Sequence, residues 1–241
     1  TDRGRKMTAD TLGACHYVSA REDITFDYLK KIMTGEQAKV LARRPDLSFG
    51  YLKDHRGAVS CQFGEELTLA MTIVEWGESD KAAQDAYVKA LSDAVIAICQ
   101  QHKVKVRIVP QVPYGPQGYG TLLTQFKANV EGHVSGFEYA ACDLLIGTRM
   151  HSVIFSWCSG TPAIGIAYDS GAKWAILNDI GTGQFIFPIQ TITADQLTGA
   201  FEGIKALSEP EVMAHIDTAC RDVVANITDW AGETGAAEIR A

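Results

Sequence analysis

The feature that most constrains the fold is an alternation of short apolar runs with longer amphipathic segments. Residues 67–76 form an apolar run with β-branched side chains, residues 81–101 place alanines and aliphatic side chains on one helical face, and residues 104–109 form a second apolar run. A strand, a helix and a strand in this order make a βαβ unit, which closes as a parallel sheet with a right-handed crossover. The pattern therefore predicts an α/β protein.

The same alternation continues to the end of the chain. We expect strands at residues 144–147, 163–167 and 185–189, and helices at residues 121–130, 134–141, 150–158, 172–179, 194–207 and 209–230. A loop rich in Pro and Gly occupies residues 110–120. The last helix carries an apolar stripe formed by Val212, Ile216, Ala219, Val223 and Ile227. The expected architecture is a doubly wound, Rossmann-like parallel sheet.

The beginning of the chain fits this architecture less well. We expect a strand at residues 16–20, a helix at residues 26–33 capped by Asp23 or Thr25, and a strand at residues 38–41. The first residue is not Met, and the opening residues resemble the interior of a longer protein. We therefore expect residues 1–56 to be the partial remnant of a preceding domain.

Composition excludes several classes of protein. The chain has 241 residues, of which 46% are hydrophobic and 21% charged, values typical of a globular protein. Its 29 acidic residues exceed its 22 basic ones, so the net charge of −7 repels phosphate backbones and we expect no nucleic-acid partner. No apolar run approaches the length of a membrane span, and the polar N-terminus does not resemble a signal peptide. We expect a cytoplasmic location.

The six cysteines favour free thiols. They are widely spaced and lie mostly in apolar runs, which is typical of buried thiols in a reducing compartment: Cys15, Cys61, Cys99, Cys142, Cys158 and Cys220. Cys99 and His102 lack a second pair with zinc-like spacing, so we expect no metal. Asn226 begins a glycosylation sequon, but we interpret it as an exposed helix residue.

The most informative segment spans residues 142–173. It contains an apolar strand, a cationic pair at a helix start, a Gly-Thr-Pro turn, a second strand and a polar turn, and its chemistry-bearing residues are Arg149, His151, Tyr168, Asp169 and Lys173. The carboxyl ends of neighbouring parallel strands meet at one edge of the sheet, so we expect these side chains at that edge. A helix N-terminus attracts anions, and Arg149 and His151 strengthen the attraction. The segment predicts a carboxylate or phosphate site.

This segment resembles the signature of the polysaccharide pyruvyl transferase family, which combines Gly-x-Arg-x-His, a helix, Gly-x-Pro, a strand and a turn similar to Tyr-x-x-Lys. Three further elements match: Arg21-Glu-Asp-Ile-Thr25, Pro45-Asp46-Leu-Ser-Phe49 and Val109-Pro-Gln-Val. The likeness extends over residues 15–190, and the gap between Tyr168 and Lys173 is longer than the family pattern has.

The resemblance implies a GT-B-like fold of two Rossmann-type domains, in which residues 1–56 would be a remnant of the first and residues 57–241 the donor-binding second. It also implies transfer of the pyruvyl unit of phosphoenolpyruvate to two hydroxyls of a sugar or glycan, free or lipid-linked, with no cofactor. Arg149 would bind the anionic donor and His151 would supply a proton. Arg21, Lys173, Tyr168 and Asp169 would complete the substrate site.

Several alternatives remain open at this point. A glycosyltransferase or sugar-nucleotide enzyme would use the same sheet and present Asp169 to a ribose, and a non-catalytic module would bind glycans or anions only. Arg21 could simply pair with Glu22 or Asp23, and Asp143 fits a turn acceptor better than a catalyst. The general base is not identified, although Asp169 and Glu138 are candidates. The acceptor sugar and the oligomeric state also stay open.

Overall fold

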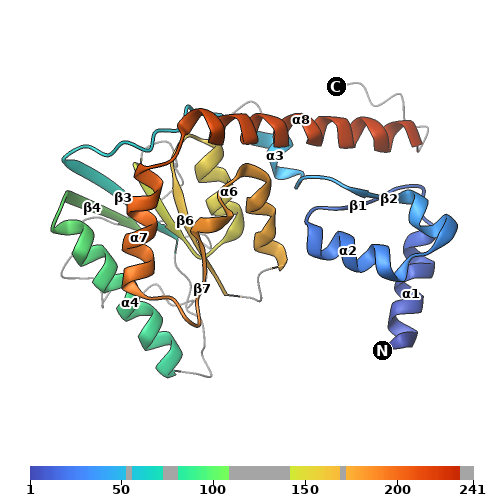
Figure 1. Cartoon of the computed structure of the whole chain (residues 1–241), viewed down its shortest axis with the longest axis horizontal. Coiled ribbons are helices and arrows are strands. Elements are labelled where there is room, and N and C mark those ends of the chain that lie inside the picture. The colour runs from blue at the N-terminus through green and yellow to red at the C-terminus, as the bar shows by residue number, and fades with distance from the viewer. Residues whose placement is uncertain (53–55, 73–80, 109–141, 169–171, 234–241) are drawn as a thin grey trace.

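A computed structural model shows a parallel sheet flanked by helices, with a smaller unit beside it (Figure 1). The structure describes residues 1–52, 56–72, 81–108, 142–168 and 172–233. The expected loop at residues 110–120 and the expected helices at residues 121–130 and 134–141 lie outside these ranges.

Within the described residues, the main sheet has five parallel strands in the order β4-β3-β5-β6-β7. Their bounds are β3 (Glu66–Thr72), β4 (Lys103–Ile108), β5 (Leu144–Gly147), β6 (Ala163–Ala167) and β7 (Ile186–Pro188). The strand order runs outward from β3 to β4 and then reverses through β5 to β7. This reversal creates a topological switch point between the carboxyl ends of β3 and β5, where ligands bind in open α/β sheets. The predicted parallel α/β architecture is confirmed.

The described helices of this larger part are α4 (Lys81–Cys99), α6 (Met150–Cys158), α7 (Ala194–Lys205) and α8 (Glu209–Glu233), together with the 3₁₀ segments η4 (Ala172–Ile180) and η5 (Gly183–Phe185). The crossover from β3 through α4 to β4 and the crossover from β5 through α6 to β6 run in opposite directions along the sheet. Because both are right-handed, α4 and α6 lie on opposite faces of the sheet. Helix α7 packs beside α4 (Figure 1). The segment expected as a helix at residues 172–179 is a 3₁₀ helix instead.

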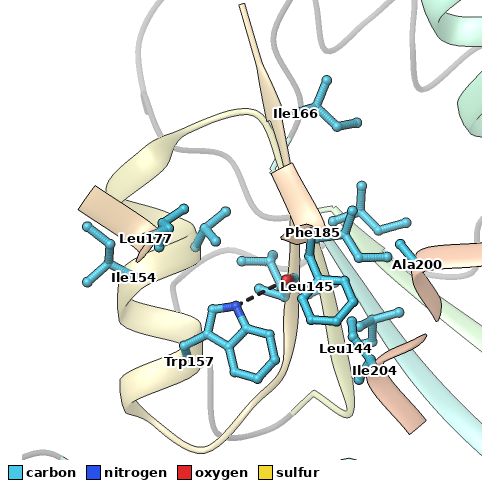
Figure 2. Packing of buried hydrophobic residues seen from close by; sticks show 14 of the residues in the cluster. Leu144, Leu145, Ile154, Trp157, Ile166, Leu177, Phe185, Ala200 and Ile204 are labelled. Atoms are coloured by element: carbon cyan, nitrogen blue, oxygen red, sulfur yellow. Dashed lines mark hydrogen bonds between the residues drawn. The ribbon is translucent and has the colours of Figure 1, made fainter. Parts of the chain in front are cut away.

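The core lies where β5 and β6 are covered by helices. All four residues of β5 and all five of β6 are buried, as central strands of a parallel sheet require. Figure 2 shows Trp157 of α6 beside β5, with its indole Nε1 donating to the Ala163 carbonyl at 3.1 Å. Trp157 and Phe185 stack with ring centroids 6.3 Å apart. This packing fixes α6 against the strand that follows it.

The first part of the chain forms a small unit with its own core. It contains α1 (Asp2–Gly13), β1 (Val18–Ala20), α2 (Asp23–Ile32), η1 (Gly35–Val40) and β2 (Leu41–Arg43), and α3 (Ser48–Leu52) leads out of it. Strands β1 and β2 pair in parallel, so this unit is also built from a strand-helix-strand crossover. Its buried cluster of Ala9, Ala20, Leu29 and Met33 is separate from the main core. The proposed division into residues 1–56 and 57–241 stays a prediction.

Two sequence expectations for this unit were wrong, and one of its helices was not expected. Helix α2 is capped by the Glu22 carboxylate, which accepts from the Thr25 backbone N–H at 3.0 Å, and not by Asp23 or Thr25. The strand expected at residues 38–41 begins only at Leu41, because the preceding residues form η1. Helix α1 was not expected at all.

Polar contacts join the small unit to α8 and η4. The Tyr17 hydroxyl donates to Asn226 Oδ1 at 2.7 Å, Arg43 binds Asp179 at 2.5 Å, and Arg44 binds Asp229 at 2.5 Å. Figure 1 shows α8 running from the main sheet to the small unit. Asn226 is therefore buried, contrary to its interpretation as an exposed helix residue.

The described helix α8 also departs from its expected apolar stripe. Val212, Ile216, Ala219 and Val223 are buried as expected, but Ile227 is 51% exposed because α8 has passed the core at that point. Among the cysteines, Cys61, Cys158 and Cys220 are buried, whereas Cys15 and Cys99 are exposed, and none of the six forms a disulfide. Among the described residues, no helix has both the length and the apolar composition needed to cross a bilayer.

The hydrogen bond from Trp157 to the β6 backbone can be tested by comparing two buried tryptophans. Trp157→Phe should lower the free energy of unfolding by about 1–2 kcal/mol more than Trp174→Phe, because the first change leaves the Ala163 carbonyl without this donor. The indole nitrogen of Trp174 is buried without a hydrogen-bond partner in the described structure, so its loss breaks no such bond. Urea unfolding of both variants measures the difference, and equal costs would contradict the assigned role of Trp157.

Candidate active site

Arg149 and His151 lie at the switch point of the sheet. Strand β5 ends at Gly147, Arg149 is the N-cap residue of α6, and His151 belongs to the first turn of that helix. Among the described residues, no side chain caps the N-terminus of α6, which leaves its first backbone N–H groups without a described partner from a side chain. The sequence prediction of a cationic helix start at the carboxyl edge of the sheet agrees with this placement.

Two threonines fix the helix start against the neighbouring strand. The Thr148 backbone N–H and its hydroxyl both donate to the Thr72 carbonyl, at 2.7 and 2.8 Å. Gly147 allows this approach, because a Cβ at that position would lie 2.9 Å from the Thr72 hydroxyl oxygen and 3.0 Å from a Val153 methyl. The first turn of α6 is thereby held at the ends of β3 and β5.

A carboxylate that the sequence prediction did not include lies at the centre of the site. Asp46 is 6% exposed, and its Oδ2 accepts from the Arg21 guanidinium at 2.7 Å. Its Oδ1 accepts from the Ser48 backbone N–H at 2.9 Å and lies 3.8 Å from His151 Nε2. The His151 distance is longer than a hydrogen bond but short enough for the carboxylate to orient the imidazole. Arg21 directly after β1, Asp46 in the turn before α3 and His151 on α6 thus meet.

The environment of Asp46 keeps it ionised. Burial by itself would raise the pKa of this carboxyl, but His151, the Ser48 backbone N–H and Arg21 outweigh burial and hold the pKa well below its usual range. Asp46 is therefore an anion at every physiological pH. A carboxylate with so low a pKa is a weak base, so orientation and charge compensation suit it better than proton abstraction.

The ion pair changes the interpretation of Arg21. Arg21 pairs with Asp46, whereas Glu22 caps α2 and Asp23 binds Arg43 at 2.8 Å, so the alternative of an ion pair within the turn is wrong. The Arg21 side chain remains 43% exposed, which leaves part of the guanidinium accessible to a ligand. Arg149 differs from Arg21, because its Nε is buried and has no hydrogen-bond partner among the described residues.

Tyr168 and Lys173 form a pair of their own beyond the end of β6. Lys173 Nζ donates to the Tyr168 hydroxyl at 2.6 Å and lies 4.3 Å from the centroid of the Tyr168 ring. Strand β6 is parallel to β5, so the pair stands at the same edge of the sheet as Arg149. Asp169 and Glu138, the two carboxylates considered as general bases, lie outside the described residues.

Other polar residues are excluded from the site by their positions. Asp143 precedes β5 at the opposite edge of the sheet, where its carboxylate accepts from the Thr68 backbone N–H at 2.7 Å, as expected for a turn acceptor. His102 Nδ1 lies 3.0 Å from the Gly64 carbonyl, also at the amino edge. No group of three or more potential metal ligands occurs within the described ranges.

Comparison with known proteins identifies the family. The family model for polysaccharide pyruvyl transferases matches residues 1–170. The chain belongs to the polysaccharide pyruvyl transferase family. The matched residues include Arg21, Asp46, Arg149 and His151. The match ends before Lys173, so the likeness to pyruvyl transferases gives no support for a role of that lysine.

One solved structure similar to this chain has a different description. It is the crystal structure of a protein described as the glycotransferase of kitacinnamycin, with a TM-score of 0.39 and 15% identity over 71% of this chain. The chain spans 42% of the length of that structure. The two-domain GT-B-like arrangement therefore stays a prediction for this member of the pyruvyl transferase family.

The contribution of Asp46 to stability should depend on pH. Asp46→Asn should lower the free energy of unfolding by about 1–3 kcal/mol at neutral pH, because it weakens charge-assisted hydrogen bonds to a buried group. Folding lowers the pKa of Asp46, so the stabilisation is complete above its ordinary pKa, about 4, and is lost as pH falls through the pKa of the folded state. The difference between wild type and variant should be constant from about pH 5 to 8 and shrink below about pH 4.

A matched substitution controls for the loss of one negative charge. Asp93 forms an exposed pair with Lys89 on α4, and Asp93→Asn should cost less than about 1 kcal/mol. Urea unfolding at several pH values compares the two variants. Equal destabilisation by both would show that Asp46 does not hold the site together.

Proposed function

We propose that this chain acts in transfer of the pyruvyl unit of phosphoenolpyruvate onto two hydroxyls of a sugar in a polysaccharide or its precursor, with formation of a ketal and release of phosphate. The observation that carries the proposal is the convergence of Arg21, Asp46 and His151 beside the N-terminus of α6. Membership of the family supports pyruvyl transfer to a polysaccharide in general. The choice of phosphoenolpyruvate as donor and of a ketal as product rests on the chemistry of the site.

The start of α6 suits a donor with two anionic groups. Phosphoenolpyruvate carries a carboxylate and a phosphate, and each can accept hydrogen bonds from a guanidinium or from backbone N–H groups. Arg149 supplies a planar cation whose buried Nε lacks a partner in the described structure, and α6 adds N–H groups without a side-chain cap. We assign the donor anions to these groups, with Tyr168 and Lys173 at the same sheet edge.

In the reaction, two sugar hydroxyls form bonds to the same carbon of the donor. The first sugar hydroxyl adds to C2 of the donor while C3 takes up a proton and becomes a methyl group. The second hydroxyl then displaces phosphate from C2 and closes the cyclic ketal. The two hydroxyls lose two protons, of which one balances the methyl group and the other leaves with phosphate.

His151 is the described group best placed to deliver the proton to C3. Its side chain is 52% exposed, so a ligand can reach the ring, and Asp46 lies 3.8 Å from Nε2 and favours one ring orientation. The negative charge of Asp46 would repel the donor, but Arg21 compensates it. Arg21 therefore serves the site by neutralising Asp46 and by presenting its exposed part to the substrate.

The role of Arg149 in donor binding can be tested with a variant that keeps the charge. Arg149→Lys should weaken phosphoenolpyruvate binding about 10- to 100-fold, because lysine lacks the planar fork that binds oxyanions. Thermal unfolding with and without phosphoenolpyruvate measures this as loss of ligand-induced stabilisation. Arg221→Lys, at an exposed position on α8 where Arg221 bonds Thr218, should bind the donor normally. Stabilisation of the wild type by UDP- or GDP-sugars and not by phosphoenolpyruvate would favour a glycosyltransferase.

The role of His151 can be separated from binding. His151→Gln should lower kcat about 10²- to 10⁴-fold, as expected for loss of a general acid, while phosphoenolpyruvate still raises Tm. Phosphate release in the presence of galactosides and glucosides gives the rate. His102→Gln controls for loss of an imidazole at the other edge of the sheet. Wild-type turnover by His151→Gln would rule out the proposed proton transfer.

A further inference from the structure

A groove lies between β1 and α8. It has a volume of about 460 Å³, and the described residues that line it are Tyr17, Ser19, Leu47, Asn226, Ile227 and Trp230. This volume falls within the range of about 300–1,000 Å³ that is usual for small-molecule sites. The volume is sufficient for a sugar ring.

Residues that line the groove are close neighbours in the chain of residues in the candidate active site. Side chains alternate along a strand, so Tyr17, Ser19 and Arg21 occupy one face of β1 and its extension. Tyr17 and Ser19 line the groove, whereas Arg21 binds Asp46. Leu47, which also lines the groove, directly follows Asp46 in the chain. A ligand extended along the groove would therefore reach the cluster of Arg21, Asp46 and His151.

The lining combines exposed apolar side chains with a few fixed polar groups. Leu47, Ile227 and Trp230 are 63%, 51% and 41% exposed, which is unusual for three large apolar side chains around one groove. The Tyr17 hydroxyl and the Asn226 amide are held together by a 2.7 Å hydrogen bond, and Ser19 adds a hydroxyl. Aromatic surfaces beside oriented polar groups suit a ligand with an apolar face and hydroxyl edges.

The charge of the groove distinguishes between the two substrates. None of the described lining residues is charged, so these residues supply no cation to pair with a phosphate or a carboxylate. The neighbouring charges, Arg44 and Asp229, pair with each other at 2.5 Å. An uncharged ligand therefore fits the groove better than the anionic donor does.

We infer that this groove binds an uncharged pyranose ring of the acceptor glycan, with the C–H face of the ring against Trp230 and its hydroxyls toward Asn226, Tyr17 and Ser19. The inference rests on the proposed function, because it places the acceptor on the side of Asp46 away from the helix start that takes the donor. The residues that recognise the glycan would then come from both β1 and α8.

Saturation-transfer NMR on the chain without donor tests this inference. The probes are the methyl glycosides of galactose, glucose, mannose and N-acetylglucosamine, together with disaccharides of the same sugars. Saturation should pass to the ring protons of at least one probe. Trp230→Ala should weaken its binding about tenfold or more, whereas Trp230→Phe should lose less because it keeps an aromatic surface.

The control on the same helix is Val224→Ala. Val224 is 43% exposed on α8 but lines a different cavity, so this variant should bind the probe like the wild type. The inference is overturned if no sugar probe receives saturation, or if Trp230→Ala binds the probe as tightly as Val224→Ala does. Binding of an apolar peptide or a lipid in the groove, without binding of any sugar probe, would also overturn it. Glycan binding that requires Trp230 without stabilisation by phosphoenolpyruvate would support the groove and contradict the proposed donor instead.

Discussion

The buried carboxylate of Asp46 is the group on which the arrangement of the site depends. It contacts Arg21 after β1, the Ser48 backbone at the start of α3, and the imidazole of His151 on α6. A buried charge is costly unless opposite charges and hydrogen bonds compensate it. Any shift of the small unit away from α6 would remove that compensation, so this one carboxylate couples the position of β1 to the N-terminus of α6.

The sequence predicted best those segments whose structure is determined locally. The bounds of β5, α6 and β6 agree with the expectation, because fully apolar strands and a short helix between Gly and polar turns leave few alternatives. Helix α1 was missed because only Ala9 of its residues is buried, so it carries almost no apolar face to detect. The Glu22 cap was missed because Asp and Thr are the more frequent capping residues in such a turn.

The residues of the candidate site also differ in how far the sequence predicted them. Arg149 and His151 could be predicted because they are neighbours on one helix start, and the parallel sheet fixes the edge at which that start lies. Asp46 gave one local signal, the Pro-Asp pair that indicates a turn, and the Ser48 N–H donates to its carboxylate within that turn. Its contacts with Arg21 and His151 depend on tertiary structure, as does the burial of Asn226 by Tyr17. These contacts join residues far apart in the chain, so no local sequence pattern could predict them.

The distribution of charge gives the site a direction. Although the chain carries a net charge of −7, the start of α6 combines Arg149 with free N–H groups and is attractive to anions. On the other side of Asp46, the groove between β1 and α8 has an uncharged described lining, and Arg21 is already neutralised by Asp46. An anion placed in that groove would find no described cation in its lining. Under the proposed function, this distribution of charge favours the helix side for the anionic donor and the groove side for a neutral sugar, with His151 and Asp46 between them.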